Sequence, residues 1–106
     1  MTDSKTFTQL FYFIFTYKKF YFASRTTFMA IMEYQRIYGK KEKFEIYPYI
    51  FEDVFNINKE KLKQVLDYFT KFNWVWYEQV DNYYVVQIDY NEISQFRNNY
   101  LETKKK

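Results

Sequence analysis

The chain has 106 residues, of which 48% are hydrophobic and 27% charged, and it contains no cysteine and no histidine. A chain of this length and composition folds as one domain with a modest core. The missing side chains exclude disulfides, thiol nucleophiles, and thiolate or imidazole metal ligands. The formal net charge of +3 is the charge of the last three lysines, Lys104–Lys106. The rest of the chain is neutral, so a global basic excess gives no argument for a nucleic-acid partner.

The absence of histidine and cysteine also argues against an enzyme. No histidine or cysteine is available as a general base or nucleophile, and a single glycine cannot build a phosphate-binding loop. Glu52 and Asp53 form an adjacent acidic pair, but neighbours on a helix do not face each other. We therefore expect no catalytic residues, no metal and no cofactor. The lack of cysteine is typical of a cytoplasmic protein.

The first predicted element is a helix over residues 6–15. The surrounding stretch, residues 6–22, is apolar on nearly every side, so periodicity alone does not separate helix from strand. It is far shorter than the roughly 20 apolar residues that a membrane span needs, so we expect no membrane association. So apolar an element must be covered by the domain or by a second copy, which favours a homodimer through this segment.

Local signals predict the next three elements. Ser24 or Thr26 is expected to cap a second helix, and Gly39 to end it in a left-handed conformation. Residues 43–47 alternate like a short strand, and Pro48 then opens a helix that ends near Phe55.

The clearest helix signal follows this short helix. Asn58 is a good cap for a third long helix over residues 59–72, and Asn73 is expected to stop it. Its apolar residues recur at helical spacing: Leu62, Val65, Leu66, Phe69 and Phe72. Two strands are expected on either side of an Asp81–Asn82 turn, and a last helix over residues 91–101.

The segment YIFEDVFNINKEKLKQVLDYFTKFNWVWYEQ resembles a winged helix-turn-helix domain. Asn73 stands where that family usually has glycine, and both residues tolerate a left-handed conformation. The resemblance implies an α+β fold: a winged helix-turn-helix with an added N-terminal element and a two-stranded wing. It implies a core over residues 24–89, an N-terminal extension over 1–23, and a C-terminal helix with a basic tail over 90–106. Members of this family usually place the third helix in the major groove and the wing on the adjacent backbone.

A narrower resemblance is to small, Tyr- and Lys-rich accessory proteins of mobile elements. The chain is similar to TcpK-like relaxosome accessory proteins of conjugative plasmids, and also to the N-terminal domains of replication initiators. Both imply binding to double-stranded DNA at an origin of transfer or replication. The first also implies a relaxase or another plasmid-processing protein as a partner.

Charge along the chain suggests an atypical way of docking on DNA. Residues 4–32 contain four basic residues and no acid, whereas residues 72–96 contain four acids and no base. Phosphate contacts need Lys or Arg, and Glu60 and Asp67 lie on the solvent side of the third helix. We therefore expect the N-terminal segment to contact the backbone, and the wing or the third helix to read bases. The predicted DNA-binding residues are Lys5, Lys18, Lys19, Arg25, Lys59, Lys61, Lys63, Gln64, Gln79, Asn82, Tyr83 and Gln87.

Other interpretations stay open at this stage. Lys18 and Lys19 fit a solvated bend, and the helix lysines fit an ordinary solvated surface. Trp74, Trp76 and Tyr77 fit a core, or less well a platform for single-stranded bases. The fold would also serve a protein–protein interaction module, whose binding should scarcely respond to salt, or a transcriptional repressor with the same surface chemistry.

Overall fold

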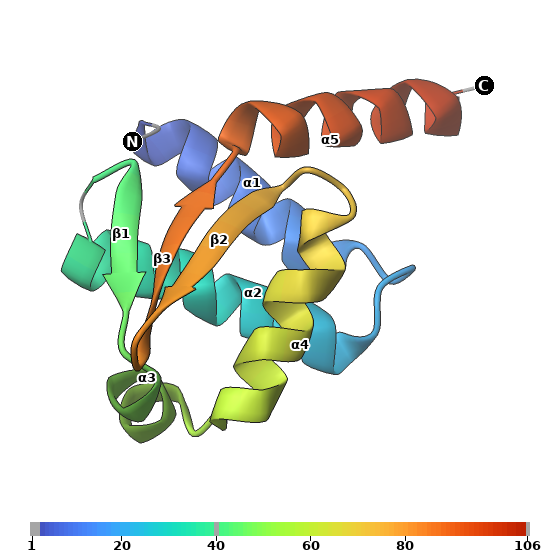
Figure 1. Cartoon of the computed structure of the whole chain (residues 1–106). Coiled ribbons are helices and arrows are strands. Elements are labelled where there is room, and N and C mark those ends of the chain that lie inside the picture. Colours follow the sequence, from blue (N-terminus) through green and yellow to red (C-terminus); the bar gives the residue numbers. More distant parts are fainter. Residues whose placement is uncertain (1–2, 40, 106) are drawn as a thin grey trace.

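The computed structural model describes residues 3–39 and 41–105, and within them the protein is an α+β structure (Figure 1). Five α-helices, one π-helical turn (η1) and a three-stranded antiparallel sheet make up this part of the chain. In chain order the elements are α1 (Ser4–Thr16), α2 (Phe22–Tyr34), η1 (Gln35–Gly39), β1 (Lys43–Ile46), α3 (Pro48–Phe55), α4 (Lys59–Thr70), β2 (Val75–Val80), β3 (Tyr83–Ile88) and α5 (Tyr90–Lys105).

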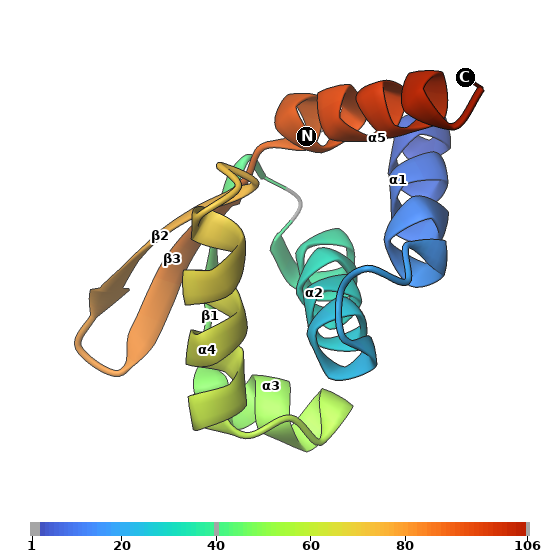
Figure 2. The same ribbon diagram turned by 90° about the vertical axis from the view of Figure 1, so that its right-hand side faces the viewer.

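The sheet has the strand order β1-β3-β2. The predicted hairpin is present as β2 and β3, but a two-stranded wing was an incomplete prediction because β1 pairs with β3 along its other edge. Glu45 of β1 and Glu78 of β2 both pair with Val85 of β3, which lies between them. One face of the sheet packs on α2 and α4, and the other face is open to solvent (Figure 2).

Aromatic rings form the centre of the core. Trp74, which is 1% exposed, stacks on Phe69 of α4 with ring centroids 5.3 Å apart. Phe20, from the loop between α1 and α2, meets the Trp74 ring at 5.5 Å, and Phe96 of α5 meets it at 5.2 Å. Trp74 therefore joins the base of the hairpin to α4, α5 and the loop after α1.

Several local signals act as predicted. Pro48 occupies the first turn of α3, and the Asn58 side chain accepts a hydrogen bond from the Lys61 backbone N–H at 2.8 Å. Asn73 takes the left-handed conformation, with φ at 61°, just before the hairpin. Asp81 takes it at the hairpin turn, with φ at 53°.

Two terminal signals around α2 were wrong. The helix begins at Phe22, before both predicted caps, and Thr26 donates its hydroxyl back to the Phe22 carbonyl at 3.0 Å. At the other end, Gly39 does not have a positive φ, because α2 runs on into the π-helical turn η1. Glycine is needed there for close packing, since a Cβ at Gly39 would lie 2.6 Å from the Cβ of Phe44.

Helix α1 is covered within its own chain. The Asp3 side chain caps it by accepting from the Thr6 backbone N–H at 2.8 Å. Its buried stripe packs on α2 and α5, and consists of Phe7, Leu10, Phe13 and Ile14. The prediction of a homodimer rested on an apolar helix without cover. Helices α2 and α5 cover the buried stripe of α1, so that argument for a homodimer no longer applies. Among the described residues, no helix combines the length and apolar character that crossing a bilayer requires.

Candidate nucleic-acid interface

Helix α4 has one face in the core and the opposite face in solvent. The buried stripe is Leu62, Val65, Leu66 and Phe69. Glu60, Gln64 and Lys71 are exposed on the other side. Of the remaining predicted contacts on this helix, Lys59 and Lys63 are exposed and Lys61 is half-buried. The accessible face therefore carries several lysines, a central amide and two carboxylates, Glu60 and Asp67.

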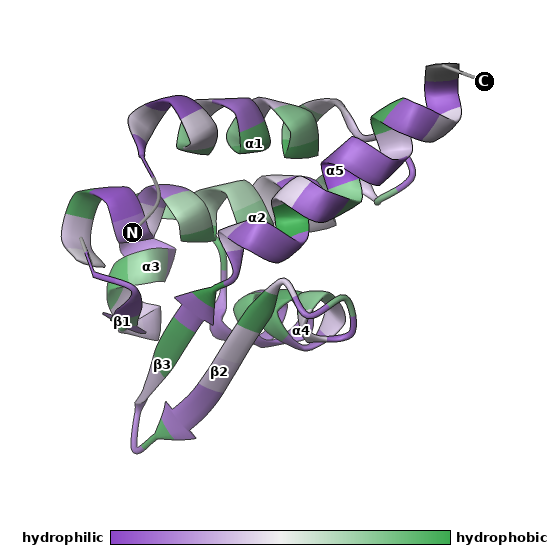
Figure 3. Ribbon diagram, turned by 90° about the horizontal axis from the view of Figure 1, so that it is seen from above, coloured by the Kyte–Doolittle hydropathy of each residue, from purple (hydrophilic) through white to green (hydrophobic). Residues whose placement is uncertain are grey.

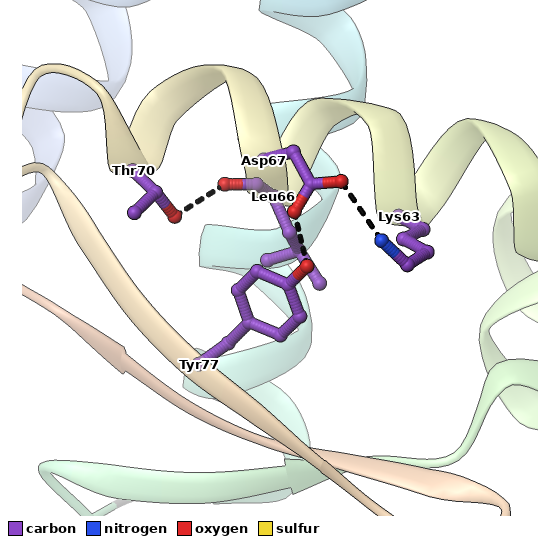
Figure 4. A network of polar contacts seen from close by, with 5 residues as sticks. All are labelled: Lys63, Leu66, Asp67, Thr70 and Tyr77. Carbon is purple, nitrogen blue, oxygen red and sulfur yellow. Dashed lines mark hydrogen bonds and ion pairs between the residues drawn. The ribbon is translucent and has the colours of Figure 1, made fainter.

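The hairpin lies along one side of α4 and is tied to it by a polar network (Figure 4). Asp67 accepts a hydrogen bond from the Tyr77 hydroxyl of β2. It also forms an ion pair with Lys63, whose Nζ lies 2.9 Å from Oδ2 of Asp67. These contacts, the one from Tyr77 foremost, hold the pKa of Asp67 below its ordinary value of 3.8. The hydrogen bond to Asp67 in turn raises the pKa of Lys63. The charges of Lys63 and Asp67 therefore offset each other, and Asp67 ties the hairpin to α4.

The loop between α1 and α2 lies along the opposite side of α4 (Figures 1 and 2). Phe20 anchors it there, with its ring 5.9 Å from Tyr68 of α4 and 5.3 Å from Phe72 in the turn that follows α4. Lys18 and Lys19 precede this anchor and are exposed. In the described part of the chain, neither lysine takes part in an ion pair.

The predicted N-terminal basic group does not form one patch. Lys5 lies in the first turn of α1, separated from Lys18 by most of a 13-residue helix, or about 20 Å at 1.5 Å per residue. Arg25 has a structural role that sequence reasoning missed. Its Nε donates to the Phe20 carbonyl at 3.1 Å and its Nη1 donates to the Phe15 carbonyl. Arg25 thus fixes the loop that carries Lys18 and Lys19.

The predicted wing residues separate into two groups. Gln79, Asn82 and Tyr83 lie at or beside the hairpin turn, where Figure 3 shows β2 becoming hydrophilic toward its end. Gln87 lies at the base of the hairpin, paired with Lys43 of β1, and its side-chain amide donates to Glu42 at 3.0 Å. Gln79 and Asn82 can therefore act together at the tip. Tyr83 faces the other side of the sheet from Gln79 and packs on Tyr47, with ring centroids 5.2 Å apart, and Gln87 is remote from the tip.

The two tryptophans lie in different surroundings, because Trp74 precedes β2 whereas Trp76 belongs to that strand. Trp74 is in the core, whereas Trp76 is 44% exposed and lies under the Lys43 ammonium group, 4.9 Å from its ring. Tyr77 is half-buried and points to α4. Of these three aromatics, Trp76 is the one left on the open face.

Sequence reasoning missed a group of exposed aromatic residues near the loop after α1. Tyr21 is 86% exposed and Phe22 is 64% exposed, and Phe15 at the end of α1 is 47% exposed. No residue pattern indicates this, because residues 6–22 are apolar on nearly every side. Only the packing of α1 shows which of its rings are left in solvent.

No group of three or more acidic residues that could hold a metal ion exists among residues 3–39 and 41–105. No protein-family model, curated protein or solved structure matches this chain.

Proposed function

We propose that the protein is a winged helix-turn-helix module that binds double-stranded DNA, acting as an accessory protein of a mobile element at an origin of transfer or replication. The duplex would lie against the exposed face of α4. Lys18 and Lys19 would contact phosphates on one side of the helix. Gln79 and Asn82, at the tip of the hairpin, would contact bases or sugars on the other side.

One observation carries the proposal. The exposed face of α4 lies between a loop that presents two lysines and a hairpin tip that presents neutral hydrogen-bonding side chains. Lysines release counterions from phosphates and so supply affinity, whereas amides distinguish base edges without net charge. The order α2, β1, α3, α4, β2, β3 is also the order that the winged helix-turn-helix resemblance implies. Lys59 and Lys61 would add positive charge at the start of α4.

A second candidate function, a protein-interaction module, is favoured by the open face of the sheet. Trp76 is exposed there, and Val85 is half-buried in the middle of the central strand. An apolar partner could cover these side chains. The acids Glu45 and Glu78 on the same face disfavour DNA at that surface.

Selection from a random duplex library separates the two functions. The purified full chain would be incubated with the library at about 50 and about 200 mM salt, a range over which phosphate-dependent binding weakens strongly. We expect one enriched motif, bound more weakly at the higher salt. No enriched motif, together with no salt-sensitive binding to any duplex, would contradict the proposal and favour the protein-interaction module.

Amide variants then show which residues read the motif. Gln64→Ala and Asn82→Ala are expected to relax the motif at particular positions while leaving the salt dependence unchanged. Gln87→Ala is the matched control, because its amide is remote from the hairpin tip and already paired with Glu42. A motif that changed with Gln87→Ala but not with the other two would place the DNA on another surface.

A further inference from the structure

The corner where α1 meets α2 exposes aromatic rings beside basic residues. This corner, called the aromatic corner below, comprises Phe15, Lys18, Lys19, Tyr21, Phe22 and Arg25. Tyr21 and Phe22 are among the most exposed large hydrophobic residues of the described chain. Exposed rings that gather at one place, unlike singly scattered ones, mark a binding surface. The core is formed by other aromatic rings, so packing in the core does not explain the exposed rings of the corner.

Arg25 holds the corner in a fixed arrangement. Its guanidinium lies over the Phe22 ring, 5.5 Å from the centroid, while its Nε and Nη1 are bonded to the carbonyls of Phe20 and Phe15. The start of α2 and the end of α1 are therefore fastened together. Phe15 and Phe22 are presented by a preorganised surface, which lowers the entropic cost of binding.

Charge is of one sign from the start of α1 to the last turn of α2, since residues 4–32 contain four basic residues and no acid. Going outward along the chain, the first acids are Asp3 before α1 and Glu33 in the last turn of α2. They lie about 16–18 Å along the helix axes from Phe15 and Phe22, at 1.5 Å per residue. Neither can neutralise the lysines of the loop.

The elements packed against the corner do not add acid to it. Helix α5 presents Tyr100, whose ring lies 5.0 Å from Tyr17, and Lys104 lies over that ring at 5.8 Å. Glu102 is two residues beyond Tyr100, and residues at that spacing face different ways on a helix. On α4, Asp67 is bound to Tyr77 on the hairpin side, away from the corner.

We infer that the aromatic corner binds single-stranded nucleic acid. Bases would stack on Tyr21, Phe22 and Phe15, and phosphates would contact Lys18 and Lys19. Single-stranded nucleic acid supplies both stackable rings and closely spaced negative charge, which is the complement of this surface. The site goes beyond the proposed duplex interface. The aromatic corner shares only Lys18 and Lys19 with the duplex interface. Substitutions of its aromatic side chains therefore test the single-strand site separately.

A second copy of the chain fits this surface less well. A two-fold symmetric dimer places the same patch on both sides of the interface. The lysines and Arg25 of one copy would then lie near those of the other, with no acid of the corner to offset them. A polyanion meets no such repulsion.

The test uses the full chain and a fluorescently labelled oligo(dT) of about 12 nucleotides, within the usual range of site sizes. We expect salt-sensitive binding by fluorescence anisotropy. Tyr21→Ala and Phe22→Ala should each weaken it at least about fivefold, because stacking is worth that much per base. Tyr49→Ala is the matched control, since Tyr49 is 67% exposed on α3 and should leave the affinity unchanged. Circular dichroism would check that each variant is folded.

Three outcomes would overturn the inference. One is no binding of oligo(dT) or of an oligo(U) of the same length at low salt. Another is binding that Tyr49→Ala weakens as much as Phe22→Ala does. The third is a concentration-dependent dimer, seen by analytical ultracentrifugation, that Tyr21→Ala or Phe22→Ala abolishes.

Cross-linking gives a readout that needs no variant. An oligo(dT) carrying 4-thiothymidine should cross-link to the peptide that contains Tyr21 and Phe22, as identified by mass spectrometry. Cross-links confined to α4 or the hairpin would contradict the inference. Duplex affinity is expected to survive Tyr21→Ala and Phe22→Ala, so failure of the single-strand site leaves the duplex proposal standing. Failure of duplex binding alone would likewise leave the single-strand site standing.

Discussion

The two flanks of α4 differ in charge and in how they are held. The loop after α1 presents Lys18 and Lys19 and is anchored by apolar packing of Phe20 and by Arg25. The hairpin carries no basic residue and is anchored to α4 by the polar contact between Tyr77 and Asp67. The difference implies a division of labour: one flank can supply phosphate affinity, and the other can supply only uncharged contacts.

The largest expected effect comes from removing the residue that joins the two flanks. Trp74→Ala deletes a ring at the base of the hairpin that contacts Phe20 of the loop and Phe69 of α4. We expect a loss of about 3–5 kcal/mol in the free energy of unfolding, as is usual for large aromatic residues in cores. Such a loss is a large share of the roughly 5–15 kcal/mol that stabilises a domain. Urea denaturation would measure it.

Trp76→Ala is the control for that experiment. It removes the same side chain two residues further on, from the open face of the sheet, and should cost far less stability. Equal losses in the two variants would contradict the view that Trp74 joins the two flanks.

The next largest effect tests the difference in charge between the two flanks of α4. Reversing the loop lysines with Lys18→Glu and Lys19→Glu should weaken duplex binding at least about tenfold at low salt. It should also make the slope of log affinity against log salt shallower by about 1.8, because each phosphate contact contributes about 0.9. Binding titrations at several salt concentrations give both values.

Lys5→Glu is matched to those reversals, because it changes the same charge about 20 Å away at the other end of α1. It should alter affinity only slightly. An unchanged salt slope in the loop variant, or an equal change in the Lys5 variant, would place the phosphate contacts elsewhere.

The smallest effect concerns how the hairpin is held. The pKa of Asp67 is lowered in the folded protein, so its contribution to stability is present above the ordinary value of 3.8 and is lost as the pH falls through the lower folded value. The carboxylate is half-exposed, and solvent screening limits the contribution to at most about 1 kcal/mol. Asp67→Asn should therefore destabilise the protein at pH 7.

At acidic pH the same variant and the wild type should become equally stable. Urea denaturation at both pH values would show this, with Glu78→Gln as an exposed control on the same hairpin. A difference between Asp67→Asn and wild type that persisted below the folded pKa would contradict the account.

Most elements could be predicted because their signals are local. Asn58, Pro48 and Asn73 act within one helical turn of their own position, and each acts as the sequence indicates. The sequence could not show that Arg25 binds a carbonyl ten residues away, or that β1 pairs with a strand some forty residues further on. Those contacts depend on how the helices pack. The same applies to residues 6–22, where an apolar pattern without periodicity hides which rings reach solvent.

The candidate site was predictable in part for the same reason. The lysines of α4 follow from its helical period once the buried stripe is known. The separation of Lys5 from Lys18, and of Gln87 from the hairpin tip, follows from the length and direction of α1 and β3. In this chain, polar and charged residues of one stretch of sequence therefore do not necessarily lie on one surface.

The central claim is that duplex DNA lies across α4 between the two flanks, and site-directed cleavage tests it most directly. The natural chain has no cysteine, so Thr16→Cys beside the loop, Asp81→Cys at the hairpin turn and Ser4→Cys at the start of α1 each give one attachment point for an iron–EDTA reagent. On the selected duplex, the first two should cut at opposite ends of the bound site, and Ser4→Cys should not cut. Cutting from Ser4→Cys alone, or from none of the three on a bound duplex, would contradict the claim.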